Sequence, residues 1–124
     1  MLVPFNFTIP DDAPFVGLAL GQYQKRLDNP SLDTASRLSL MRCWSQQFLS
    51  LGDYLLALEI LEEAIALQPD NPFTLALHGF AQEQAGKTQQ AIKTYQQVLD
   101  FLGDSHHPIV AELWYRQGTV RRTH

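Results

Sequence analysis

Apolar residues recur at every third or fourth position along most of this chain, which is the spacing of one buried face of an α-helix. Between residues 32 and 51, for example, Leu38, Met41, Trp44 or Ser45, and Phe48 keep this spacing without an intervening glycine or proline. The pattern predicts an all-α fold of about six helices, over residues 13–27, 32–51, 54–67, 73–85, 88–101 and 109–117.

Glycines and prolines divide the predicted helices into pairs. Gly52 and Gly86 each stand between two apolar-periodic segments, and glycine can adopt the left-handed conformation that closes a helix. We expect Asp53 to cap the helix that follows Gly52. Proline-containing breaks at 28–31, 68–72 and 102–108 separate one pair from the next. The chain is thus predicted to form antiparallel helical hairpins.

The two ends of the chain differ from its centre. Residues 1–12 are predicted to be an extended arm, because Phe5, Phe7 and Ile9 alternate with polar residues between two prolines. The apolar side chains of the arm are unfavourable in water, so we expect the arm to pack on its own domain or on a neighbouring copy. A single helical domain is expected over 13–118, with an acidic cap from Asp11 and Asp12 and a frayed tail at 119–124.

One pattern occurs twice at a fixed distance. The segment 52–61 is matched 34 residues later by 86–95, and the offset also relates Ile65 to Leu99. A unit of this length holds two short helices that cannot bury their apolar faces alone, so neighbouring units must stack. Stacked units present a curved surface, which favours binding over catalysis.

These residues resemble the tetratricopeptide repeat family over residues 38–105. The first unit has the family's glycine, aromatic, small and proline residues at Gly52, Tyr54, Ala57, Ala64 and Pro69. In the second unit Gly86, Ala91 and Tyr95 occupy the glycine, small and aromatic positions. Val98 replaces the second small residue there, and Gly103 replaces the proline. The family's tryptophan is replaced by Met41 in the first unit and by Leu75 in the second. The resemblance implies a short right-handed solenoid of two complete units, capped by the flanking helices.

The resemblance also implies where a partner would bind. In the family, the first helix of each pair lines a concave groove that holds partner peptides or helices. The corresponding positions here are Arg42, Gln46, Leu49, Ser50, Phe73, Ala76, Phe80, Glu83 and Gln84. Arg42 could fork onto a carboxylate, and Phe80 offers a flat apolar surface. Binding of chaperone tails through a two-carboxylate clamp is disfavoured, because Leu77 stands where the clamp needs asparagine.

Charge narrows the range of partners. The formal net charge of -4 and the pI near 5.4 provide no global attraction for nucleic acid or anionic lipid. No apolar run approaches the length of a membrane span. Glu59, Glu62 and Glu63 cluster on the outward side of their predicted helix, which indicates an acidic outer face that is either a basic partner's docking site or an ordinary solvated surface.

The residues that could carry chemistry do not form a recognisable site. His106 and His107 are adjacent and cannot converge on one ion, and Cys43, the single cysteine, stands among apolar residues. We therefore expect no bound metal, no cofactor and no catalytic activity. A lone cysteine and the lack of a signal-peptide pattern favour the cytoplasm.

The sequence thus predicts a non-catalytic protein-protein interaction module, serving as an adaptor, a scaffold or an assembly factor. Its partner would be a peptide or helix bound in the concave groove. One alternative is a structural subunit that forms homo-oligomers through its apolar capping helices. Another is a regulatory accessory domain that binds a small ligand in the groove.

Overall fold

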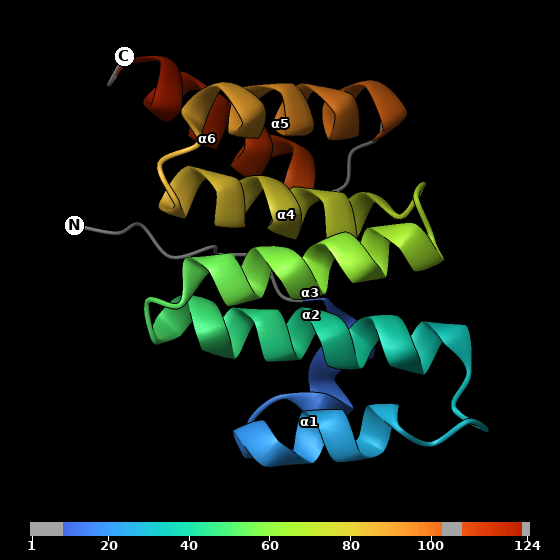
Figure 1. Ribbon diagram of the computed structural model, residues 1–124. Helices are drawn as coiled ribbons and strands as arrows, with labels where there is room; N and C mark the ends of the chain where they lie inside the picture. The colour runs from blue at the N-terminus through green and yellow to red at the C-terminus, as the bar shows by residue number, and fades with distance from the viewer. Residues whose placement is uncertain (1–8, 103–107, 123–124) are drawn as a thin grey trace.

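The computed structural model describes residues 9–102 and 108–122. In these residues a short 3-10 helix is followed by six α-helices and no strand, which confirms the all-α prediction: η1 (Pro10–Phe15), α1 (Leu20–Leu27), α2 (Thr34–Ser50), α3 (Tyr54–Leu67), α4 (Pro72–Gln84), α5 (Thr88–Leu102) and α6 (Pro108–Arg122). Successive helices pack side by side from α1 to α5, with α6 against α5 (Figure 1). The protein is a short helical solenoid.

Both hairpin turns close in the same way. Gly52 and Gly86 each have a φ of 81°, a left-handed conformation that costs glycine little. After Gly52 the amide of Asp53 donates to the carbonyl of Phe48 at 2.8 Å, and after Gly86 the amide of Lys87 donates to Gln82 at the same distance. The predicted role of Asp53 is wrong, because its side chain makes no capping hydrogen bond.

Side-chain caps fix the starts of α2 and α4 instead. The carboxylate of Asp33 accepts the amide of Ser36 at 3.0 Å. The side-chain oxygen of Asn71 accepts the amides of Phe73 and Thr74 at 3.0 and 3.1 Å. These bonds satisfy amides that have no partner within their own helix. The cap at Asn71 also places Thr74 in the first turn of α4.

The predicted helix over 13–27 is interrupted in its first half. Val16 and Ala19 are extended, and Gly17 between them has a φ of 84°, so no helix can run through them. The chain before the break forms η1, which begins at Pro10 inside the predicted arm. Residues 1–8 of that arm lie outside the described residues.

The last helix is longer than the sequence pattern indicates. It runs from Pro108 to Arg122 and passes through Gly118, whose φ is not positive. The predicted tail therefore continues the helix as far as Arg122. Gly118 does not terminate it, because glycine lowers helix stability by only about 1 kcal/mol relative to alanine when no turn is required there.

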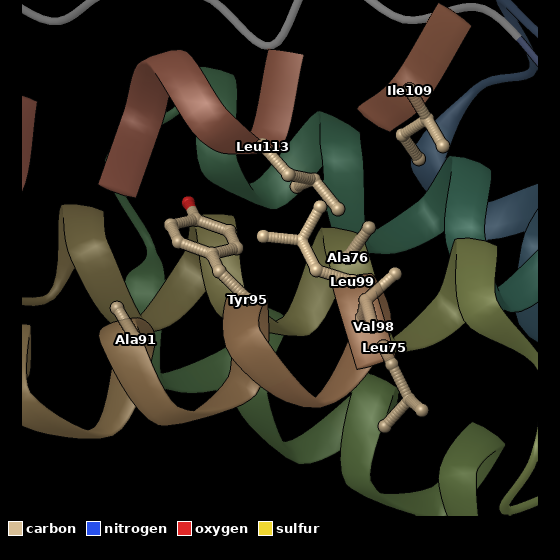
Figure 2. Close-up of a cluster of buried hydrophobic side chains, with 8 residues drawn as sticks. All are labelled: Leu75, Ala76, Ala91, Tyr95, Val98, Leu99, Ile109 and Leu113. Carbon is tan, nitrogen blue, oxygen red and sulfur yellow. The ribbon is translucent and has the colours of Figure 1, made fainter. Parts of the chain in front are cut away.

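The flanking helices cover both ends of the two hairpins, as predicted. Figure 2 shows Leu113 of α6 directed toward Leu99 of α5, and both belong to a buried cluster that also includes Ile109, Tyr95 and Ala76. At the other end, α1 contributes the fully buried Tyr23, which packs with Leu40 and Cys43 of α2. Burial of these apolar faces stabilises the stack.

Gly79 is required by close packing of α4 against α5. A Cβ at this position would lie 2.7 Å from Cε1 and 2.8 Å from Cδ1 of the fully buried Tyr95 ring. We expect Gly79→Ala to lower the free energy of unfolding by about 1–3 kcal/mol, the usual cost of overpacking. Urea denaturation followed by circular dichroism measures this loss.

Gly21 in α1 provides the matched control. A Cβ at Gly21 meets no atom within 4 Å. Gly21→Ala should therefore leave stability unchanged or raise it by up to about 1 kcal/mol through helix propensity alone. If Gly79→Ala were as stable as the unaltered protein, the contact between α4 and α5 would not be as close as the structure shows.

Candidate functional site

The helices α2, α4 and α6 form one continuous surface, which we call the inner face. α2 and α4 are the first helices of the two pairs, and α6 follows the second pair. α2 contacts α4, and Arg116 of α6 reaches Phe80 and Glu83 of α4. The inner face corresponds to the predicted groove, and its buried arginines Arg42 and Arg116 are each held by other groups of the chain.

Arg42 of α2 lies at the centre of a buried polar cluster. Its Nε and Nη2 donate to the two carboxylate oxygens of Asp12, at 3.2 Å to Oδ2 and 2.9 Å to Oδ1. Nη1 donates to the Thr74 hydroxyl at 3.0 Å, and Nη2 also to the Ser39 hydroxyl at 3.3 Å. Arg42 and Asp12 are each only 3% exposed. This forked, charge-assisted pairing is selective for a carboxylate.

The carboxylate comes from η1, which lies against α2. The thiol of Cys43 donates to the backbone oxygen of Asp12 at 3.5 Å, and the hydroxyl of Tyr23 donates to that of Phe15 at 2.8 Å. Ile9, at the start of the segment, is also buried. Residues 9–15 are thus held by their own chain, and Asp12 binds Arg42 instead of serving as the predicted helix cap.

Arg116 of α6 forms the second buried cluster. It is 1% exposed, and its Nε donates to Oε1 of Glu112 at 2.7 Å. Nη1 lies 3.4 Å from Oε2 of Glu83, and the guanidinium carbon is 4.5 Å from the centre of the Phe80 ring. The hydroxyl of Tyr95 donates to the other oxygen of Glu83 at 2.8 Å. The cluster joins α4, α5 and α6.

The predicted groove residues differ in accessibility. Arg42, Leu49, Ala76 and Phe80 are buried, whereas Phe73, Glu83 and Gln84 are partly exposed. Gln46 and Ser50 are exposed. The expectation that Arg42 is open to a partner is not met, because its guanidinium is hydrogen-bonded to the Asp12 carboxylate. Phe80 is not an open flat surface either, since it packs in the core under Arg116.

An accessible hollow lies beside the Arg42 cluster, because its lining includes Cys43, whose thiol donates to the backbone oxygen of Asp12. It has a volume of about 300 Å³ and is lined by Gln46, Gln47 and Ser50 of α2 together with Val16, Gly17, Tyr23 and Cys43. Gln47 donates a hydrogen bond to the Tyr23 hydroxyl at 2.9 Å, which fixes one wall. Polar side chains on one side and the exposed Val16 on the other suit a segment of mixed character.

The predicted acidic outer face is accessible. Glu59, Glu62 and Glu63 are all exposed on α3. Oε1 of Glu62 lies 4.0 Å from Nε2 of His78. Burial lowers the pKa of His78, so the imidazole is mainly neutral near pH 7 and this contact is not a full ion pair.

Several members of the two clusters cannot be recognised from the sequence pattern. The pattern predicts Asp12 as a helix cap and gives no role to Arg116, Ser39 or Thr74. One signal was present in α2: Ser39, Arg42 and Ser45 interrupt the apolar spacing of a helix that is buried over this length. Polar residues at buried positions require partners, so they indicate a polar cluster.

Within residues 9–102 and 108–122, no three His, Cys, Asp or Glu side chains gather as metal ligands. His106, His107 and His124 lie outside that part of the chain. None of the described helices is long and apolar enough to cross a membrane.

Cys43 should react slowly with thiol reagents in the folded protein. Burial raises the pKa of its thiol from 9.0 to about 12, and the Asp12 carboxylate adds to this shift while Arg42 opposes it. We expect Ellman's reagent at pH 8 to label Cys43 rapidly only after unfolding, because the thiolate is the reactive form. Equal labelling rates for folded and unfolded protein would contradict this.

The same raised pKa has a consequence for stability. Above about pH 9 the unfolded chain loses the Cys43 proton while the folded chain retains it up to about pH 12. The free energy of unfolding should therefore fall as the pH rises through this window. A Cys43→Ala variant should show a smaller fall over the same range, which separates the thiol from other groups.

Comparison with known proteins adds one finding. A protein-family model described as a tetratricopeptide repeat matches residues 48–113. The matched range begins within α2 and ends within α6, so it includes all of α3, α4 and α5 and both glycine turns. No curated protein and no solved structure matches the chain significantly.

Proposed function

The chain belongs to the tetratricopeptide repeat family, and on this premise we propose that it is a non-catalytic adaptor or assembly factor that binds a partner peptide or helix on its inner face. Repeats of this family generally mediate interactions between proteins. One observation supports the choice of face: residues 9–15 already lie on it, with the Asp12 carboxylate forked by Arg42. A surface that holds one such segment has the chemistry to hold another.

The accessible part of the inner face supports the same proposal. Gln46 and Ser50 lie one turn apart on α2 and border the hollow of about 300 Å³. Their side chains offer hydrogen bonds, and the adjacent Val16 is 67% exposed. A peptide in contact with these residues would pass directly beside the Arg42 cluster. As part of the proposal we place the protein in the cytoplasm, where a free thiol such as Cys43 remains reduced.

Panning a library of random peptides against the full-length protein tests this function. The inner-face variant Gln46→Arg/Ser50→Arg places two bulky charges at exposed positions, so the buried clusters remain intact. We expect it to lose at least tenfold in affinity for the peptides that the unaltered protein selects. Circular dichroism and thermal melting verify that the variant folds.

The matched control carries two arginines on the acidic outer face. Glu59→Arg/Glu63→Arg has the same one-turn spacing at exposed positions of α3. We expect it to bind the selected peptides within twofold of the unaltered protein. If this control loses binding and the inner-face variant does not, the acidic outer face is the binding site and the proposal is wrong.

Self-association is a second candidate function, favoured by α6. Trp114 on this helix is 55% exposed, and Phe101 at the end of α5 is 56% exposed. Large aromatic side chains at the surface are enriched at protein interfaces. Sedimentation of the unaltered protein and of Trp114→Glu would measure this. A dimer that the variant abolishes supports it, whereas a monomer at every concentration tested rules it out.

A further inference from the structure

The segment 9–15 resembles a bound ligand in the way it is held on the inner face. Its anchors are one buried aliphatic side chain, Ile9, one carboxylate, Asp12, and backbone oxygens that accept from Cys43 and Tyr23. Each is a group that a separate peptide could supply. The segment is a single short 3-10 helix, and the backbone bonds from Asp12 to Ile9 at 2.9 Å and from Val16 to Ala13 at 3.4 Å join its two ends.

Residues 16–19 connect the segment 9–15 to α1, and their backbone is suited to a movement of that segment. Val16 and Ala19 are extended, Gly17 is left-handed, and the hollow of about 300 Å³ lies beneath this stretch. A Cβ added at Gly17 would meet no atom within 4 Å. The chain is thus loosely packed at Gly17 itself, while its neighbour Leu18 is held by a hydrogen bond from Gln47 to its backbone oxygen.

Arg42 makes the site selective for an acid. Arg42 is 3% exposed, and among the described groups in hydrogen-bond contact with its guanidinium only Asp12 is charged. The hydroxyls of Ser39 and Thr74 do not neutralise it. A segment that takes the place of residues 9–15 and keeps Arg42 buried must bring a carboxylate of its own, because a buried, unpaired charge is costly.

We propose that residues 9–15 are a built-in competitor, and that the partner docks by inserting a short acidic segment that takes the same 3-10 turn and displaces them. This inference rests on the proposed function and specifies the partner's chemistry. The segment carries an Asp or Glu that binds Arg42, preceded three residues earlier by a branched aliphatic side chain in the position of Ile9. Because the competitor is tethered at a high effective concentration, it lowers the apparent affinity of the partner.

Removal of the competing carboxylate tests the proposal. The probe is a fluorescein-labelled synthetic peptide with the sequence of residues 9–18, and the host is full-length protein carrying Asp12→Asn. Fluorescence anisotropy should show at least tenfold tighter binding to this variant than to the unaltered protein. A probe with asparagine at the Asp12 position should lose at least tenfold. Asp53→Asn, the same change at an exposed residue, should bind the probe as weakly as the unaltered protein does.

Two further measurements keep the test decisive if Asp12→Asn folds poorly. Ile9→Ala weakens the competitor and leaves the ion pair in place, so it should also increase affinity for the acidic probe. In the unaltered protein, excess acidic probe should shift the Arg42 Nε-H signal in nitrogen-edited NMR spectra, and the asparagine probe should not. Equal binding of the two probes, or affinities within twofold for all hosts, overturns the proposal.

The outcomes also separate this inference from the function on which it rests. If library peptides bind the inner face with no preference for an acid and no gain in Asp12→Asn, the competitor is disproved and the interaction module stands. If the unaltered protein sediments as a dimer that the acidic probe dissociates, the segment is exchanged between copies and the proposal is overturned. If Gln46→Arg/Ser50→Arg still binds every selected library peptide while Asp12→Asn binds the acidic probe at least tenfold more tightly than the unaltered protein, the proposed function alone is contradicted.

Discussion

Arg42→Met is expected to lower the free energy of unfolding by about 3–5 kcal/mol, the cost of leaving one partner of a buried ion pair without the other. Methionine retains an apolar chain of similar length but cannot pair with Asp12, whose side chain is only 5% exposed. The hydroxyls of Thr74 and Ser39 lose their donor as well. Urea denaturation at pH 7, followed by circular dichroism, measures the loss.

The double variant Arg42→Met/Asp12→Leu distinguishes charge from packing. It removes both charges, and replacement of a whole buried pair by apolar residues is often neutral or stabilising. We therefore expect it to recover most of the stability lost in Arg42→Met. Arg26→Met, at an exposed position of α1, should change stability by no more than about 0.5 kcal/mol. A double variant no more stable than the single one would show that the cluster matters through its shape instead of its charge.

Leu61→Ala is expected to cost about 2–5 kcal/mol, because it opens a cavity between the two hairpins. Leu61 of α3 is fully buried in a cluster with Leu58 of its own helix and with Leu77 and Phe80 of α4. A loss of this size is a large part of the 5–15 kcal/mol typical of a domain. Thermal melting and urea denaturation should both report it.

Leu55 supplies the matched control on the same helix. It is 69% exposed, so Leu55→Ala removes the same atoms with little change in buried area. We expect an effect within about 0.5 kcal/mol. If the two variants were equally destabilised, helix propensity and not the contact between hairpins would explain the loss.

The helices and the repeat could be predicted from local pattern. Apolar spacing placed α3 and α5 to within a residue, and the glycines at 52 and 86 predicted both tight turns. Such features depend on residues close in sequence, so a single chain reveals them. The break at Gly17 was missed because apolar spacing continues across it, while the backbone there is left-handed.

The candidate site was predicted less well, for a physical reason. Position within the repeat correctly placed Gln46 at the surface, but it also placed Arg42 there. Burial of Arg42 depends on Asp12, 30 residues earlier, and on Thr74, 32 residues later. Pairings over such distances leave no periodic signal in one sequence.

The sequence by itself determined that this chain forms helical hairpins in a 34-residue repeat, because apolar spacing and turn glycines act locally. Only the tertiary structure decided which parts of the inner face are accessible. Charges distant along the chain meet there, and a buried arginine must be paired wherever the fold brings a carboxylate to it. The fold brings Asp12 to Arg42, so the part of the predicted partner surface around Arg42 is already occupied by the protein's own residues 9–15.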